Sequence, residues 1–153
     1  RLLETGSGRI STVSKVFIDT NILVYQIDKR YPKKQSICRS VVREAALKGE
    51  AVISTQVLQE FYVATTTKLK VDPILAKSII QRFENMEIII VTKELINEAI
   101  DINMQNSVSF WDALIIAAAE SAKCDMLFTE DLGDGDVISG VKVRNPFRMM
   151  RSE

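Results

Sequence analysis

The amino-acid sequence predicts an α/β fold, in which helices on both faces cover a parallel, roughly five-stranded sheet in three layers, α/β/α. Short apolar runs rich in β-branched residues alternate with longer segments of helical periodicity. The runs are continuously apolar, which is typical of strands that are buried on both faces. The length of 153 residues suits one domain with a real core and is too short for two ordinary ones.

Strands and helices follow one another in a regular order. The predicted strands are 16–18, 51–54, 87–91, 126–129 and 141–143. The predicted helices are a short one that begins near Ile22, then 33–48, 55–70, 73–84, 93–105 and 111–123. Asp72 before Pro73 is typical of a capping residue followed by proline in the first helical turn. No internal repeat or low-complexity linker divides the chain, so we expect one domain over 15–147. Residues 1–14 are expected to be a flexible tail or a remnant of an added sequence, and 148–153 a C-terminal tail.

The composition excludes several classes of function. Lysine plus arginine and aspartate plus glutamate both number 20, so net charge gives no global reason to expect nucleic acid or an anionic membrane as partner. Histidine is absent, which excludes Ser-His and Cys-His nucleophiles and histidine-bearing zinc sites. Cys38 and Cys124 form no Cys-x-x-Cys pair, and a reducing, cytoplasmic setting is expected. No apolar stretch reaches the roughly 20 residues of a membrane span, and the first residues are too polar for a signal peptide. Carboxylates are therefore the leading candidates for chemistry.

Asp19 and Asp112 are the two acids placed beside buried segments. Asp19 directly follows the strand 16–18 in VFIDTN, where it either caps the next helix or forms one wall of a charged site. Asp112 lies in the first turn of FWDALIIAAAE, a helix that is apolar almost all round and is therefore expected to be buried. Ser109 to Asp112 also resembles a capping box, so capping and a functional site are both open for this residue.

Glu60 and Asp131 are the other two candidate acids. Glu60 lies within about two turns of the start of the helix after the second strand, on one side with Gln56 and Gln59, so a solvated polar face is the alternative explanation. Asp131 follows the fourth strand in FTEDLGDGD, where an acidic surface turn is the alternative.

The joint pattern of these acids predicts a metal site. In an open parallel sheet, ligands bind outside the carboxyl ends of the strands, where the following helices also begin. If the first and fourth strands are neighbours, all four acids converge on one crevice. Two carboxylates about 4 Å apart repel by ~4 kcal/mol at an effective dielectric constant near 20, so the cluster needs a cation. Oxygen ligands without histidine or cysteine favour magnesium or manganese, which would support phosphodiester hydrolysis.

VFIDTNILVY, STQVLQEFY, SFWDALIIAAA, LFTEDLGDG and GVKVRNPF, in this order, resemble the PIN domain of VapC-type toxins over about residues 15–147. The resemblance implies a five-stranded parallel sheet and a magnesium- or manganese-dependent endoribonuclease. It also implies a homodimer and a cognate antitoxin. The apolar helix surface of 74–80 is a candidate for the dimer contact.

The resemblance also assigns residues to the site. Asp19 matches the acid after the first strand, Glu60 the acid of the next helix and Asp112 the acid of the apolar helix. Asp131 matches the fourth acid, for which Glu130 and Asp134 are alternatives. Asn21 and Thr129 match polar positions that would orient the acids, with a capping residue and a strand-end hydroxyl as the alternative interpretation.

RNA contacts are less specifically indicated. Basic side chains near the first strand and at the end of the Glu60 helix either bind phosphates or form a solvated face, and the second is the more ordinary interpretation: Lys33, Lys34, Arg39, Arg43, Lys68 and Lys70. Trp111 is expected in the core, with base stacking as the alternative.

Three other functions fit parts of the pattern. A metal-dependent phosphatase would use the same acids on phosphomonoesters. A non-cleaving RNA-binding or protein-binding PIN-like module would have little reason to retain clustered, repelling charges. Calcium binding by DLGDGD is disfavoured, because the acid spacing departs from the helix-loop-helix calcium pattern and its closing glutamate is missing.

Overall fold

The structure, a computed structural model, describes residues 2–4, 10–12 and 14–149. Its main sheet has six strands in the order β5-β4-β3-β6-β8-β7. Five of them run parallel, and β7 pairs antiparallel with β8 at one edge. The strands are β3 (Val16–Ile18), β4 (Ala51–Ser54), β5 (Glu87–Ile89), β6 (Met126–Phe128), β7 (Val137–Ile138) and β8 (Val141–Arg144). The predicted parallel sheet is confirmed, with one antiparallel strand added.

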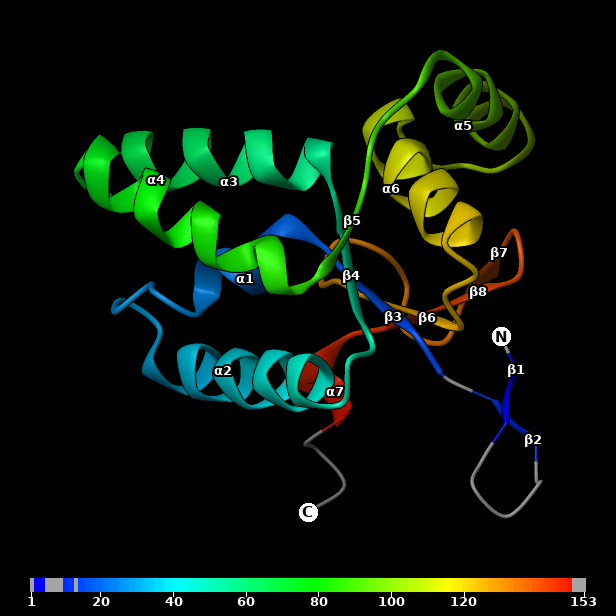
Figure 1. The fold of residues 1–153 in the computed structure, drawn as a ribbon. Helices are drawn as coiled ribbons and strands as arrows, with labels where there is room; N and C mark the ends of the chain where they lie inside the picture. The colour runs from blue at the N-terminus through cyan, green and yellow to red at the C-terminus, as the bar shows by residue number, and fades with distance from the viewer. Residues whose placement is uncertain (1, 5–9, 13, 150–153) are drawn as a thin grey trace.

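Helices cover the sheet on both sides (Figure 1). Helices α2 and α7 lie on one side of it, and α5 and α6 on the other. Helix α6 packs on the central strands, and α5 packs on α6. The helices are α1 (Thr20–Tyr25), α2 (Pro32–Leu47), α3 (Thr55–Thr67), α4 (Pro73–Arg82), α5 (Lys93–Gln105), α6 (Phe110–Ser121) and α7 (Pro146–Met149), with a 3₁₀ turn η1 (Phe83–Asn85) after α4. No helix in the described part of the chain is long and apolar enough to cross a membrane.

The predicted elements are present, and most differences concern their ends. Helix α3 ends at Thr67 rather than at residue 70, because Lys70 takes a left-handed backbone conformation with φ of 56°. Helix α4 gives way to the 3₁₀ turn at Phe83. Asp72 caps α4 by accepting a hydrogen bond from the Ile74 N–H, as predicted from the Asp-Pro pair. The short strand β7 was not predicted, because two residues between turn residues carry no strand periodicity.

The tails were also predicted from the sequence. Within the predicted N-terminal tail, β1 (Leu2–Glu4) pairs antiparallel with β2 (Ile10–Thr12), and residues 1, 5–9 and 13 lie outside the described residues. At the other end, α7 continues past the predicted boundary at 147, and residues 150–153 lie outside the described residues.

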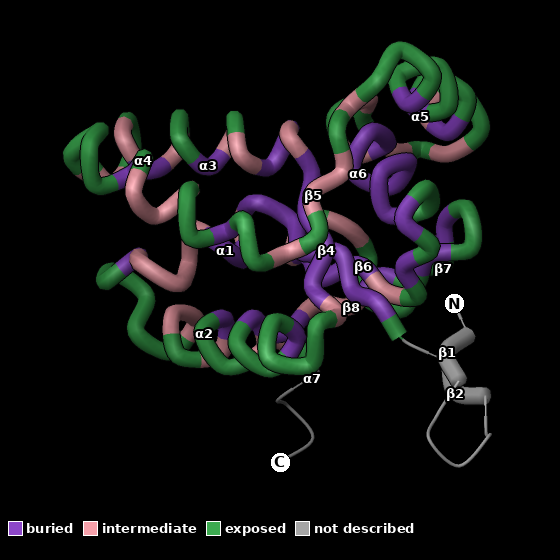
Figure 2. The backbone as a smooth tube through the Cα atoms, in the orientation of Figure 1, coloured by how far each residue is buried: buried purple, intermediate pink, exposed green. Residues whose placement is uncertain are grey.

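The core lies between the sheet and its helices (Figure 2). Strands β3 and β4 are buried along their whole length, which their continuously apolar sequences predict. Residues Ala113–Ala119 of α6 are all buried, so the expectation of a buried apolar helix is confirmed. Strand β3 lies between β4 and β6, in register with both. This order sets the carboxyl ends of the first and fourth predicted strands side by side.

Candidate active site

Asp19 lies at the carboxyl end of β3, where it caps a helix and also lines a pocket. It is the capping residue of α1, and its Oδ1 accepts a hydrogen bond from the Thr20 backbone N–H at 2.7 Å. Its other oxygen, Oδ2, accepts from the Thr129 hydroxyl at 2.8 Å. Thr129 itself is fully buried at the end of β6. The carboxyl group is thus held from two neighbouring strands while it lines a pocket.

The position of Asp19 makes its negative charge unfavourable in the protein alone. Burial raises the pKa of Asp19 to about 7, although hydrogen bonds from Thr129 and Thr20 oppose the rise. The nearby charges of Asp131 and Glu60 raise the pKa further. At neutral pH this carboxyl group is therefore only partly ionised in the protein alone, and a positive group close by would favour its ionised form.

Asp112 begins the buried helix α6. The Ser109 hydroxyl oxygen accepts a hydrogen bond from the Asp112 N–H at 3.1 Å, so the predicted cap of this helix is confirmed. The carboxyl group itself is half-buried. Its pKa is raised, mainly by burial, although the Ser109 hydrogen bond lowers it, and the charges of Asp131 and Glu60 add to the rise. Ser109 satisfies the helix end, and the carboxyl group remains available to the pocket.

Asp131 is the acid of the fourth strand's turn that faces Asp19. The Asn21 amide Nδ2 donates to Asp131 Oδ2 at 2.9 Å and lies 3.4 Å from Asp19 Oδ2. The Asp131 backbone N–H donates to the Thr129 hydroxyl oxygen at 3.1 Å. Asn21 and Thr129 therefore bridge the two acids, in keeping with the orienting role that the family resemblance implies for them.

The alternative fourth acids are engaged elsewhere. Glu130 pairs with the Lys34 ammonium at 3.0 Å and accepts a hydrogen bond from the Tyr25 hydroxyl. Asp134 accepts from the Asn145 backbone N–H at 2.8 Å, within its own loop region. Both contacts turn these carboxylates away from Asp19, which favours Asp131 as the fourth acid.

Three carboxylates meet at the carboxyl edge of the sheet. One oxygen from each of Asp19, Asp112 and Asp131 lies within 4.8 Å of the other two. Each ionised pair at this separation repels by about 3 kcal/mol at an effective dielectric constant near 20. No ion pair within residues 14–148 involves any of the three. Oxygen donors at this spacing, one of them buried, fit a hard divalent cation such as Mg²⁺ or Mn²⁺.

Glu60 lies beside this triad rather than within it. Its Oε1 accepts a hydrogen bond from the Thr20 hydroxyl at 2.7 Å, and the Thr20 backbone N–H donates to Asp19. Its Oε2 is 3.4 Å from the Gln56 amide Nε2, which also donates to the Trp111 carbonyl at 3.2 Å. Gln56 is buried whereas Gln59 is exposed, so the side of α3 that carries Glu60 is only in part the solvated polar face that was the alternative explanation.

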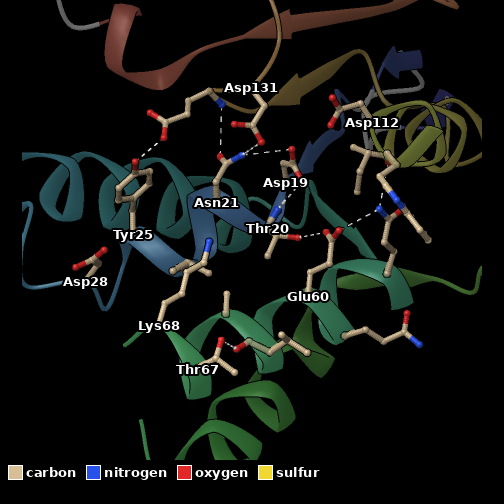
Figure 3. Close-up of a pocket in the computed structure, with 18 of the residues that line it drawn as sticks. Asp19, Thr20, Asn21, Tyr25, Asp28, Glu60, Thr67, Lys68, Asp112 and Asp131 are labelled. Atoms are coloured by element: carbon tan, nitrogen blue, oxygen red, sulfur yellow. Dashed lines mark hydrogen bonds between the residues drawn. The ribbon is translucent and has the colours of Figure 1, made fainter. Parts of the chain in front are cut away.

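The four acids line one pocket of about 690 Å³. Figure 3 shows Asp19, Asp112 and Asp131 near one another, Glu60 across from them, and Lys68 with Tyr25 and Asp28 toward the other side. Arg30, Tyr31 and Lys68 also line this pocket, and Lys68 and Lys70 line an adjoining cavity of about 590 Å³. The pocket therefore has an acidic part and a part that carries cations.

The other predicted basic residues lie away from the acids. Lys34 is paired with Glu130, and Arg39 Nε donates to the Gln26 carbonyl at 2.8 Å. Lys33 and Arg43 are exposed and line neither cavity, which agrees with a solvated face. Among the predicted contacts, Lys68 is the one that reaches the acidic pocket.

Three residues of the site were missed or misjudged from the sequence. Trp111 is 61% exposed and lines the pocket, so the prediction that it belongs to the core is wrong. Its neighbours along α6 are buried, but the first turn of a helix projects beyond the layer that covers the sheet. The Thr20 hydroxyl of α1 reaches Glu60 of α3, and Gln56 of α3 reaches the Trp111 carbonyl of α6. No local signal in the sequence indicates these two contacts between elements.

A parallel sheet with clustered carboxylates at its carboxyl edge defines a candidate acidic metal centre of the nuclease or phosphatase class. The family model described as PIN domain matches residues 16–133, and the chain belongs to this family. No curated protein matches it.

Several solved structures share the fold. DNA-bound VapBC from Salmonella typhimurium has a TM-score of 0.65 and 17% identity, over 88% of this chain and 99% of the other. A toxin-antitoxin complex from Klebsiella pneumoniae has a TM-score of 0.64 and 20% identity, over 87% and 98%. VapC20 from Mycobacterium tuberculosis, described as a sarcin-ricin loop cleaving toxin, has a TM-score of 0.58 and 18% identity, over 76% and 92%.

Proposed function

We propose that this protein is a divalent-metal-dependent endoribonuclease and the toxin of a type II toxin-antitoxin pair. The observation that carries the proposal is the convergence of Asp19, Asp112 and Asp131 within 4.8 Å at the carboxyl edge of a PIN-domain sheet. Helix capping alone does not explain this convergence, because a role at a helix start does not require Asp19 and Asp112 to approach each other. VapC20 is described as a sarcin-ricin loop cleaving toxin, which supports RNA as the proposed substrate class.

Asp19, Asp112 and Asp131 would hold Mg²⁺ or Mn²⁺, with Glu60 as a further acid of the site beside them. The bound cation would supply charge neutralisation at a phosphate oxygen and a more acidic water. Thr129 and Thr20 fix the two oxygens of Asp19, and Asn21 holds Asp131 beside it. Glu60 is anchored by the Thr20 hydroxyl outside the triad, where it would hold a water or accept its proton.

The cationic part of the pocket would bind the RNA backbone. Lys68 and Arg30 line the same cavity as the acids. Arg30 is already paired with Asp28 at 2.9 Å, whereas the Lys68 ammonium forms no ion pair or hydrogen bond with another described residue. A phosphate next to the cleaved bond would satisfy this charge. This contact would position the strand without reading its sequence.

The proposal includes two protein partners and a location. The likeness to chains of toxin-antitoxin complexes supports a cognate antitoxin as partner. A homodimer would use the exposed Ile74 and Leu75 at the start of α4, whereas Ile79 and Ile80 of the same predicted surface pack on the core. The setting would be the cytoplasm, where the buried thiols of Cys38 and Cys124 stay reduced.

The test is cleavage of a mixed pool of structured RNA with Mg²⁺ or Mn²⁺, with EDTA, and with the Asp19→Asn protein. We expect internal cuts that require the metal and are lost in Asp19→Asn. A parallel assay on phosphomonoesters distinguishes the phosphatase, which would hydrolyse these and leave internal RNA bonds intact. RNA binding without any cut would instead identify a binding module.

Asp134→Asn is the matched control for this experiment. It removes a carboxylate from the same acidic turn as Asp131, and its contact to the Asn145 N–H can be kept by the amide oxygen. Asp131→Asn should therefore reduce cleavage far more than Asp134→Asn. The reverse order would mean that the fourth acid has been assigned to the wrong residue.

A further inference from the structure

Trp111 is displayed at the site rather than buried. It is the single tryptophan of the chain, and its side chain is 61% exposed. Large aromatic side chains are mostly buried, and an exposed one at a concave polar site is a common mark of a binding surface. Its helix is buried from Ala113 to Ala119, so the apolar character of α6 already has its place in the core. The exposed indole ring, in contrast, is not part of this buried core.

The helical turn that carries the ring is fixed to its neighbours, and the ring itself contacts Phe110. The Gln56 amide donates to the Trp111 carbonyl at 3.2 Å, which ties the first turn of α6 to α3. Phe110 packs edge-on against the indole, with ring centroids 5.2 Å apart and planes at 74°. Ser109 caps the helix immediately before both rings. A preorganised aromatic surface loses little conformational freedom when a ligand stacks on it.

The ring also shares its pocket with the acids. Trp111 precedes Asp112 in the chain, and both line the cavity that holds Asp19 and Asp131. A strand with one phosphate at the acids would have the adjoining base near this wall. Lys68, which also lines the pocket, offers a compact ammonium that suits a phosphate rather than the face of a base.

We propose that Trp111 stacks on a nucleobase beside the cleaved bond. This inference rests on the proposed ribonuclease function. Every base offers a π-face, so the contact supplies affinity and positioning and tolerates changes of sequence. Paired RNA would satisfy it poorly, because its bases are already stacked on one another.

The kinetic test compares Trp111→Ala, Trp111→Phe and the wild type on a short unpaired RNA. We expect kcat/KM to fall about tenfold in Trp111→Ala, the usual size of a lost base-aromatic stack, and to be largely kept in Trp111→Phe. Tyr62→Ala is the matched control, since Tyr62 is an exposed aromatic of α3 that does not line the pocket. An unchanged kcat/KM in Trp111→Ala overturns the inference, and the proposed ribonuclease then still stands.

The fluorescence of the single tryptophan gives a second readout that does not depend on cleavage. RNA added to the Asp19→Asn protein should quench the emission, whereas an abasic oligomer with the same number of phosphates should not. If the wild type cuts no RNA, the proposed function fails and this base-dependent quench alone decides the inference. Emission that responds to a protein partner and not to RNA would assign Trp111 to a protein contact and overturn the proposal.

Discussion

The amino and carboxyl edges of the sheet each contain a buried charged residue, but within the described residues only the one at the amino edge is paired with an opposite charge. At the amino edge, the buried ammonium of Lys15 contacts the Glu87 carboxylate at 2.6 Å and donates to the Ala122 carbonyl at 2.8 Å. At the carboxyl edge, Asp19 is equally buried, yet its nearest charged neighbours are acids. A charge that serves stability is compensated within the fold. The uncompensated charge at the opposite edge is therefore the one expected to meet a ligand.

The largest expected effect comes from removing one acid of the carboxyl edge. Asp19→Asn and Asp112→Asn should each lower RNA cleavage about a thousandfold, because a metal site that loses a ligand loses several kcal/mol of transition-state stabilisation. The free energy of unfolding should stay the same or rise, since each change removes one repelling charge. Cleavage rates and urea titrations check both expectations. Global unfolding together with lost activity would instead favour a capping role.

The next effect is a dependence of stability on pH in metal-free buffer. The folded pKa of Asp19, about 7, is above its ordinary value of 3.8, so the folded state retains a proton that the unfolded state releases. Stability is then highest at low pH and falls as the pH rises through 7. Between pH 5 and pH 8 the free energy of unfolding should drop by roughly 2–3 kcal/mol from this group.

Asp19→Asn should remove most of this slope, and added Mg²⁺ should reduce it. Urea titrations at pH 5, 6, 7 and 8, with and without Mg²⁺, measure the change. A slope that is the same in the wild type and in Asp19→Asn would show that the buried carboxyl is not its source.

A smaller effect is expected at the amino edge. Lys15→Met should lower the free energy of unfolding by about 2 kcal/mol, because the Ala122 carbonyl loses its donor while the partly exposed Glu87 remains solvated. Cleavage per folded molecule should not change, since Lys15 precedes β3 at the amino edge of the sheet and the acids lie at the carboxyl edge. Thermal unfolding and an activity assay on the same samples test this. Lost cleavage in a folded Lys15→Met protein would break the contrast between the two edges.

The smallest effect is expected at Gln56, which joins α3 to the first turn of α6. Gln56→Met removes the hydrogen bond to the Trp111 carbonyl and the contact with Glu60, at a stability cost of about 1 kcal/mol. Less exact placement of Glu60 should lower kcat/KM roughly fivefold, by the same order of free energy. Gln81→Met, which changes an exposed glutamine of α4 that lines neither cavity, is the control. Equal effects of the two changes would remove Gln56 from the site.

The acids of the site were predictable to different extents. Asp19 and Asp112 were recognisable because each adjoins a continuously apolar segment, where a charge is conspicuous. Asp131 was preferred to Glu130 and Asp134 only by the family resemblance, because the contacts that separate the three acids come from Lys34, Tyr25 and the Asn145 backbone, which bind the other two. Neighbouring carboxylates in one turn have the same local signal, and partners from distant segments distinguish them.

The burial of Trp111 and of Gln56 was predicted wrongly from the sequence, in opposite directions. Apolar periodicity predicted a buried tryptophan, but the ring lies at the exposed start of α6. Polarity suggested a solvated glutamine, but Gln56 is buried against that same helix start. Whether a residue at a helix end is covered depends on the element packed beside it, and periodicity along one helix carries no information about that neighbour.

The sequence by itself determined the α/β class, the order of the parallel strands along the chain and the edge of the sheet at which Asp19 and Asp131 emerge. These follow from periodicity and from strand direction, which are local properties. Only the tertiary structure decided that β3 lies next to β6, that three carboxyl groups come within 4.8 Å, and that Trp111 opens into their pocket. Those distances depend on which surfaces pack together, and packing joins residues about a hundred positions apart in the chain.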